Sequence, residues 1–261
     1  MNFNLKDLIE FYDSELGKIS VISIQEKLHK FLDTKLKQNV LGFGYILPYL
    51  RKKDIASKIN FLSIPSTNNK IKYYRNELNA SLEVDETSLP FNDLEFDKVF
   101  VSHWLEVSDR LDLVFSELWR VLKGQGKIIF IIPNSFSLWS NIENNPFGKC
   151  RPFSKSQIKK LLNLHGFEEI KVEFCLYFPP YNYKLLVKNH KLIENIGRAL
   201  FRNIGGVMVI EATKFNYAIP KKQLKAYRYI FPKVSLQQYS FVINKKKIIN
   251  NVTWMKIIKN Y

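Results

Sequence analysis

The sequence predicts an α/β fold in which an open sheet is covered by helices on both sides. Two observations lead to this prediction. Strand-like runs alternate along the chain with amphipathic helical segments. Several of these runs are almost continuously apolar, which is typical of strands that are buried on both faces. Since the ligands of such sheets bind beyond the carboxyl ends of the strands, a functional site is expected there.

Apolar residues at helical spacing predict the helices. The helical segments are 4–38, 109–126, 154–166 and 185–202. Gly124 and Gly126 are expected to end the second segment. Ser154 and Gln157 have the spacing of a capping box at the start of the third segment. The strand-like runs are 39–43, 58–64, 79–84, 96–102, 126–132, 168–178 and 205–213.

Length and composition predict one domain with an appendage, since the chain has 261 residues of which 46% are hydrophobic. We expect a helical segment over 1–38, an α/β domain over 39–215 and a basic extension over 216–261. An acidic N-terminus, with no run approaching about 18 apolar residues, indicates a cytoplasmic protein without a signal peptide or transmembrane segment. Cys150 and Cys175 form no CxxC pair, which indicates neither a metal site nor a disulfide framework.

The formal net charge of +16 is unevenly distributed. Positions 220–261 hold ten Lys or Arg and no acid, whereas positions 77–117 hold eleven acids and two basic residues. The sequence favours a solvated, partly packed extension for this basic tail, since the tail has no recognisable nucleic-acid motif. The alternative is contact with nucleic acid or an anionic membrane, because aromatic residues lie among its lysines.

The central block, residues 83–134, carries a series of motif residues in one order. They are Asp85 and Glu86, Leu89 to Phe91, Phe96 and Asp97, His103 to Glu106, Arg120 to Lys123, Gly124 and Gly126, then Pro133 and Asn134. With these residues the chain resembles the class I S-adenosylmethionine-dependent methyltransferases, over roughly positions 35–215. The resemblance implies a Rossmann-like, doubly wound sheet of seven mostly parallel strands whose last strand is antiparallel. It also implies S-adenosylmethionine as the cofactor.

The resemblance places the cofactor turn after the first strand, at Gly42, Phe43, Gly44 and Tyr45. In the family this strand ends in an acid and continues as GxGxG, because bare backbone lets the cofactor lie against the turn. Here Gly42 stands at the position of the acid and Gly44 at the first glycine. Ile46 and Pro48 replace the other two glycines.

Further cofactor contacts are implied at the ends of later strands. Ser66 follows the second strand, where the family's ribose-binding carboxylate is replaced by weaker hydrogen-bonding groups. Asp85 and Glu86 lie in the acidic loop, and Asp85 matches the acid that is expected to face the adenine amino group. Ser102 and His103 follow the fourth strand, and His103 is also the candidate general base.

The stretch 135–154 follows the fifth strand, where family members carry inserts that close over the pocket and select the substrate. Trp139, Arg151 and Phe153 are the candidates to contact a substrate, and Arg151 suits a carboxylate or phosphate group. The alternative is a packed surface loop in which Trp139 and Phe153 simply cover the sheet.

These features predict a methyltransferase that uses S-adenosylmethionine and acts on an oxygen or nitrogen of a small molecule or protein. The alternative is a non-catalytic, methyltransferase-like scaffold whose cofactor turn is blocked and whose basic tail binds its partner. A nicotinamide or flavin enzyme is excluded, because Leu47 replaces the third glycine of GxGxxG and the acid about 20 residues further on is missing. A phosphate-binding P-loop is also absent from the sequence.

Overall fold

The computed structural model describes residues 5–31, 38–51, 59–65, 74–75, 78–79, 81–181, 183 and 187–215. The chain divides into two compact units, 1–223 and 224–261, and only the first contains described residues. The predicted basic extension over 216–261 and the predicted cofactor contact Ser66 lie outside the described residues.

The helices and strands alternate along the described chain. The helices are α1 (Leu5–Asp13), α2 (Glu15–Leu28), α4 (Leu111–Val121), α5 (Lys155–Leu164) and α7 (His190–Leu200), with short 3-10 helices η1 (His29–Phe31), η2 (Leu47–Arg51) and η3 (Trp139–Asn141). The strands are β1 (Val40–Gly44), β2 (Ile59–Pro65), β3 (Tyr74–Arg75), β4 (Leu78–Asn79), β5 (Ser81–Val84), β6 (Phe96–Ser102), β7 (Leu122–Pro133), β8 (Phe167–Cys175) and β9 (Val207–Lys214).

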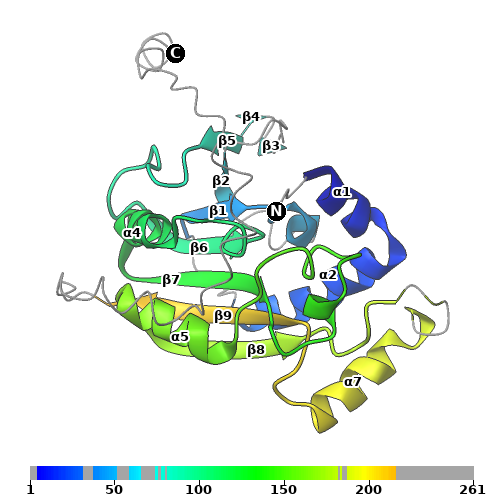
Figure 1. The fold of residues 1–261 in the computed structure, drawn as a ribbon. Coiled ribbons are helices and arrows are strands. Elements are labelled where there is room, and N and C mark those ends of the chain that lie inside the picture. Colours follow the sequence, from blue (N-terminus) through cyan, green and yellow to red (C-terminus); the bar gives the residue numbers. More distant parts are fainter. Residues whose placement is uncertain are drawn as a thin grey trace, which may run out of the picture. The chain divides into compact units, whose positions relative to one another are not determined.

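The main sheet has the strand order β5-β2-β1-β6-β7-β9-β8 (Figure 1). The first five strands in this order pair in parallel, whereas β9 runs antiparallel to both β7 and β8. β3 and β4 form a separate antiparallel pair. The predicted α/β, Rossmann-like fold with a mixed sheet is therefore confirmed.

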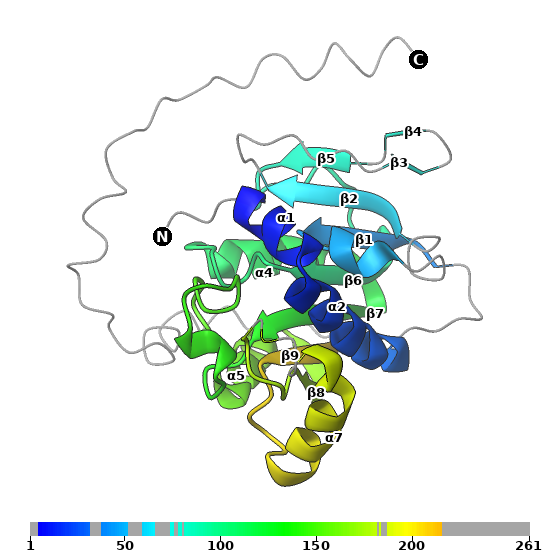
Figure 2. The ribbon, with the colours of Figure 1, turned by 90° about the vertical axis from the view of Figure 1, so that its right-hand side faces the viewer.

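Both faces of the sheet are buried, as the apolar strand sequences predict. In β7, Ile129 and Ile131 belong to the core that the sheet shares with α1 and α2. On the alternate positions, Phe130 contacts Phe115 of α4 with the ring centroids 5.7 Å apart. Figure 2 accordingly shows α1, α2 and α7 on the opposite side of the sheet from α4 and α5.

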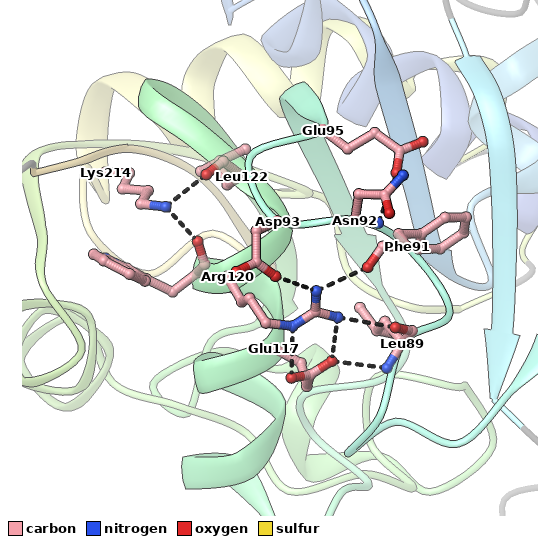
Figure 3. Close-up of polar contacts among 10 residues, drawn as sticks. Leu89, Phe91, Asn92, Asp93, Glu95, Glu117, Arg120, Leu122 and Lys214 are labelled. Atoms are coloured by element: carbon pink, nitrogen blue, oxygen red, sulfur yellow. Dashed lines mark hydrogen bonds and ion pairs between the residues drawn. The ribbon is translucent and has the colours of Figure 1, made fainter.

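Two predicted boundaries are wrong. The helix α4 ends at Val121 rather than at Gly124 or Gly126, and Leu122 is already extended. The physical reason is a side chain from β9, because Lys214 Nζ donates to the carbonyl oxygens of Trp119 and Leu122, 2.7 and 2.6 Å away (Figure 3). A distant lysine thus binds the carbonyl groups that a glycine cap would otherwise satisfy.

The strand β8 ends at Cys175 instead of continuing to 178. Leu176 has a positive φ of 62°, which is incompatible with a strand. The backbone amides of Leu176 and Tyr177 donate instead to the Glu194 carboxylate of α7. The predicted capping box of α5 is confirmed, since Ser154 accepts from the Gln157 amide and the Gln157 side chain accepts from the Ser154 amide.

The loop that precedes β6 is attached to α4 by a guanidinium. Figure 3 shows Arg120 between Glu117 and the loop. Its nitrogens donate to the carbonyl oxygens of Leu89 and Phe91 and to both oxygens of Glu117, at 2.8–3.0 Å. Glu117 in turn accepts from the Leu89 amide. These bonds fix the loop that follows the acidic residues 85 and 86.

Among the described residues, no helix combines the length and the apolar character needed to cross a membrane. The same residues contain no group of three or more His, Cys, Asp or Glu placed to hold a metal ion.

Arg120→Lys is expected to lower the free energy of unfolding by about 1–3 kcal/mol, because one ammonium cannot replace a planar fork that binds both the helix and the loop. Urea denaturation measures the change. Arg202→Lys, at an exposed position, is the matched control and should change stability by less than about 0.5 kcal/mol. Equal stability of the two variants would contradict the anchoring role of Arg120.

Candidate functional site

The candidate site lies at the carboxyl ends of β1, β5 and β6. In the register of the sheet, Gly44 at the end of β1 is paired with Ser102 at the end of β6. Gly44 has a φ of 80°, and a Cβ at this position would collide with the Ser102 carbonyl oxygen. The Tyr45 amide donates to that same oxygen, 2.9 Å away. The glycine is therefore required by the close approach of two strands, in addition to any role toward a ligand.

A buried chain of polar side chains crosses this end of the sheet. His103 Nε2 lies 2.6 Å from the Tyr12 hydroxyl of α1, which lies 2.7 Å from the Tyr49 hydroxyl of η2. On its other side, His103 Nδ1 is 3.3 Å from Glu106 Oε1. Each of these four residues is at most 3% exposed. Three elements that are far apart in the sequence thus meet at one histidine.

The direction of these contacts depends on the histidine tautomer. In the tautomer with its proton on Nδ1, Nε2 accepts from the Tyr12 hydroxyl, whose oxygen can accept from Tyr49. Burial raises the pKa of both tyrosine hydroxyls well above their usual value, so both remain protonated donors. The backbone of His103 has a positive φ of 53°, an uncommon conformation that is found in functional turns.

Glu106 carries the most exceptional polar group of this region. Its side chain is only 1% exposed, and among the described residues neither carboxylate oxygen accepts a hydrogen bond. Within the described part of the chain, its contact with a titratable partner is the one with His103 Nδ1, 3.3 Å from Oε1. Since a buried carboxylate with so few donors is costly, a cationic group bound beside it would be favourable.

The acidic loop after β5 adds two further carboxylates. Asp85 is exposed, and its carboxylate accepts hydrogen bonds from the backbone amide and the hydroxyl of Thr87. The hydrogen bond from the amide is the main cause that lowers the pKa of the Asp85 carboxyl group. Glu86 is half-buried and accepts from the Ser108 hydroxyl, 3.1 Å away. Burial raises the pKa of the Glu86 carboxyl group. The site is therefore acidic, and its two loop carboxylates differ in their exposure to water.

Aromatic rings enclose His103. The Phe147 ring lies 5.3 Å from it, and the rings of Tyr12 and Tyr45 lie 5.6 and 6.5 Å away, all measured between centroids. Phe11 of α1 in turn contacts Phe147. The helix α1 therefore closes over the turn, and Lys149 strengthens this closure through an ion pair with Asp7.

The structure brings most of the predicted site residues together but gives them different surroundings. Gly42, Phe43, Gly44, Ser102 and His103 are buried, and Tyr45 and Glu86 are half-buried. Gly42 and Phe43 lie within β1, and Phe43 contacts the Trp104 ring. Sequence reasoning did not single out Tyr12, Tyr49 or Glu106 as site residues. The signal for Glu106 was its place three residues after His103, whereas nothing local marks the two tyrosines.

The predicted substrate residues lie in the loop 135–154. Trp139 is 1% exposed, donates through Nε1 to the Phe178 carbonyl oxygen at 2.7 Å and packs on Gly206. Phe153 is fully buried, and the Arg151 guanidinium lies over its ring. Arg151 also donates to the Ser108 carbonyl oxygen. In this conformation both aromatic residues cover the sheet, so their contact with a substrate stays a prediction.

Comparison with known proteins relates this arrangement to one family. The model of the family described as "Methyltransferase domain" matches residues 41–130. An uncharacterised protein of Methanocaldococcus jannaschii is 29% identical over 134 residues, which are 48% of this chain and 57% of that protein. The match thus spans little more than half the length of this curated relative.

Solved structures share the fold. An S-adenosylmethionine-dependent methyltransferase of Thermotoga maritima, described as a possible histamine N-methyltransferase, aligns with a TM-score of 0.58 and 18% identity, over 80% of this chain and 95% of that one. A methyltransferase of Archaeoglobus fulgidus aligns with a TM-score of 0.55 and 20% identity, over 81% of this chain and all of the other. At these identities the likeness shows the fold alone.

Tyr12→Phe is expected to lower the free energy of unfolding by about 1–3 kcal/mol, because it removes the one hydroxyl that binds both His103 and Tyr49 in a buried site. Chemical denaturation measures the effect. Tyr181→Phe, which removes an exposed hydroxyl, should be neutral within about 0.5 kcal/mol. If Tyr12→Phe were equally neutral, the hydrogen-bonded chain through His103 would not contribute to folding.

Proposed function

We propose that the protein binds S-adenosylmethionine beyond the carboxyl ends of β1, β5 and β6, and the match of residues 41–130 to the family model described as "Methyltransferase domain" supports this proposal. The protein transfers the methyl group to an oxygen or nitrogen of a small molecule or protein. The observation that carries the proposal is Glu106, a buried carboxylate in the predicted site that is underprovided with hydrogen bonds.

The charge of the residues at the candidate site is complementary to the positive groups of this cofactor. S-adenosylmethionine carries a positive sulfonium and a positive ammonium group, and three carboxylates follow the strands that end at the candidate site, two after β5 and Glu106 after β6. A cation beside Glu106 would offset the cost of that buried charge. The exposed Asp85 carboxylate is available to the polar edge of the adenosine moiety, as the resemblance implies.

The departures from the family's glycine turn suggest that other groups of this protein contact the cofactor. Tyr45 and Ile46 occupy the turn, and the closing surface is aromatic, from Tyr12, Tyr45 and Phe147. Aromatic faces attract cations, and a dry enclosure strengthens the attraction to a carboxylate. Recognition of the cofactor would therefore depend more on acidic and aromatic side chains, and less on bare backbone, than in relatives with three glycines.

Methyl transfer needs little acid or base catalysis from the protein. The cofactor supplies an electrophilic methyl group on a sulfonium that leaves without protonation. The protein supplies proximity and an enclosed site, and a base only where the acceptor must lose a proton. We assign that role to His103, because Glu106 orients its Nδ1 side. The route to Nε2 passes through the Tyr12 hydroxyl, which therefore takes part in any proton transfer.

Calorimetry on the full chain tests the cofactor assignment. S-adenosylmethionine is expected to bind, and Glu106→Gln should weaken its binding by roughly tenfold, because a buried charge pair is lost. The neutral product S-adenosylhomocysteine, which lacks the sulfonium charge, should lose less affinity in the same variant. Glu143→Gln, an exposed change of the same size, is the control and should leave both affinities unchanged.

Two results would count against the assignment. Absence of binding at millimolar S-adenosylmethionine, with a normal thermal transition, would overturn the enzyme function and favour the non-catalytic scaffold. An equal loss of affinity for cofactor and product in Glu106→Gln would show that Glu106 does not act through the sulfonium charge.

A further inference from the structure

The helix α7 carries an exposed apolar stripe. Leu192, Ile196 and Leu200 recur every four residues and therefore form one stripe along the helix. They are 60%, 50% and 69% exposed, and the stripe continues into Phe201 and Ile204 beyond the end of the helix. A helix that covers a core has the opposite arrangement, with its apolar stripe buried. Packing within the domain therefore does not explain why this stripe is apolar.

The inner side of α7 combines Ile193, which packs against the core, with polar contacts that fix the helix. Glu194 is only 4% exposed and accepts from the Ser23 hydroxyl of α2 and from the amides of Leu176 and Tyr177, at 2.6–3.0 Å. Gly197 packs directly on the Tyr177 side chain. The outward direction of the stripe is therefore fixed by a carboxylate with three donors and by a glycine contact. Figure 2 shows α7 at the outer edge of the helical layer, beside α2.

Basic residues lie on the other sides of α7. Lys191 and Arg198 stand seven residues apart on the side of the helix that faces α2, and they line a cavity of about 120 Å³ between α2 and α7. His190 also lines this cavity, together with one acid of α2, Glu26. Glu194, the other acid there, is already bound by three donors. Exposed Lys188 and Arg202 extend the basic character at the two ends of α7.

We propose that α7 docks the protein on an anionic lipid surface, with the stripe Leu192, Ile196 and Leu200 among the acyl chains and the exposed basic residues Lys188, Lys191 and Arg202 on lipid phosphates. An amphipathic helix that combines an apolar face with basic residues is the pattern of helices that lie in a membrane interface. Exposed Tyr181 and Tyr183, just before α7, are aromatic residues of the kind that favour the headgroup level.

Charge favours an anionic lipid surface over a second copy of the chain as the partner of the stripe. The chain carries a net charge of +16, and its last 42 residues hold ten basic residues and no acid. A second copy of the chain would bring the same exposed basic residues of α7 to the stripe, and like charges repel. An anionic bilayer offers both apolar depth and the opposite charge, which attracts each surface lysine or arginine by about 1 kcal/mol.

Vesicle co-sedimentation of the full chain tests the proposal, with phosphatidylcholine vesicles compared with vesicles that also contain phosphatidylserine. The protein is expected to bind the anionic vesicles. The double variant Leu192→Gln with Ile196→Gln should reduce binding by about tenfold or more. Lys191→Gln should reduce it by about fivefold. Because the tail is intact in every variant, its own contribution is constant.

Leu113→Gln is the matched control, since Leu113 of α4 is 52% exposed and lies on the opposite side of the sheet from α7. It should leave vesicle binding unchanged, and all variants should keep the wild-type thermal transition because the changed side chains are exposed. Unchanged binding by the double variant would overturn the proposal. So would a dimer in light scattering that the same variant abolishes, because the stripe would then be an interface between copies.

Discussion

The close approach of β1 and β6 is the constraint on which the described site depends. At Gly44 the two strand ends come so near that a side chain would strike the Ser102 carbonyl oxygen. The chain must then turn at once, and the turn places η2 and Tyr49 beside the residues that follow β6. The positive φ of His103 is the matching turn on the neighbouring strand. Two left-handed residues on paired strands thus create the place where Tyr12 can be bound.

Local pattern was sufficient for most of the fold. Helical periodicity identified α1, α2, α4, α5 and α7, and the capping box at Ser154 was correct to the residue. The errors lie where a distant side chain replaces a local signal. Lys214 of β9 ends α4 before its glycines, and Glu194 of α7 takes the amides that would have lengthened β8. Such contacts have no periodicity and cannot be recognised from a short stretch of sequence.

For the site, the motif predicted that Asp85, Glu86, Ser102 and His103 lie at the carboxyl ends of two strands, and the structure places them at the ends of β5 and β6. Their roles toward a ligand stay predictions. Tyr12 is 91 residues from its partner His103, and no spacing rule connects them. Residue type alone was equally insufficient for Trp139 and Phe153, since an aromatic residue in a loop suits a substrate pocket and a packed cover alike.

The position of Tyr12 also bears on where the functional unit of this protein begins. The family model starts at residue 41, yet α1 supplies a hydrogen bond to His103 and the rings that enclose it. The matched segment and the candidate site are therefore not the same piece of chain. A fragment cut to residues 41–130 would lack β8 and β9 as well as α1, and His103 would lose the cover of Tyr12 and Phe147. Expression boundaries, fusion tags and chimeras with relatives should for this reason be chosen around α1, as part of the site.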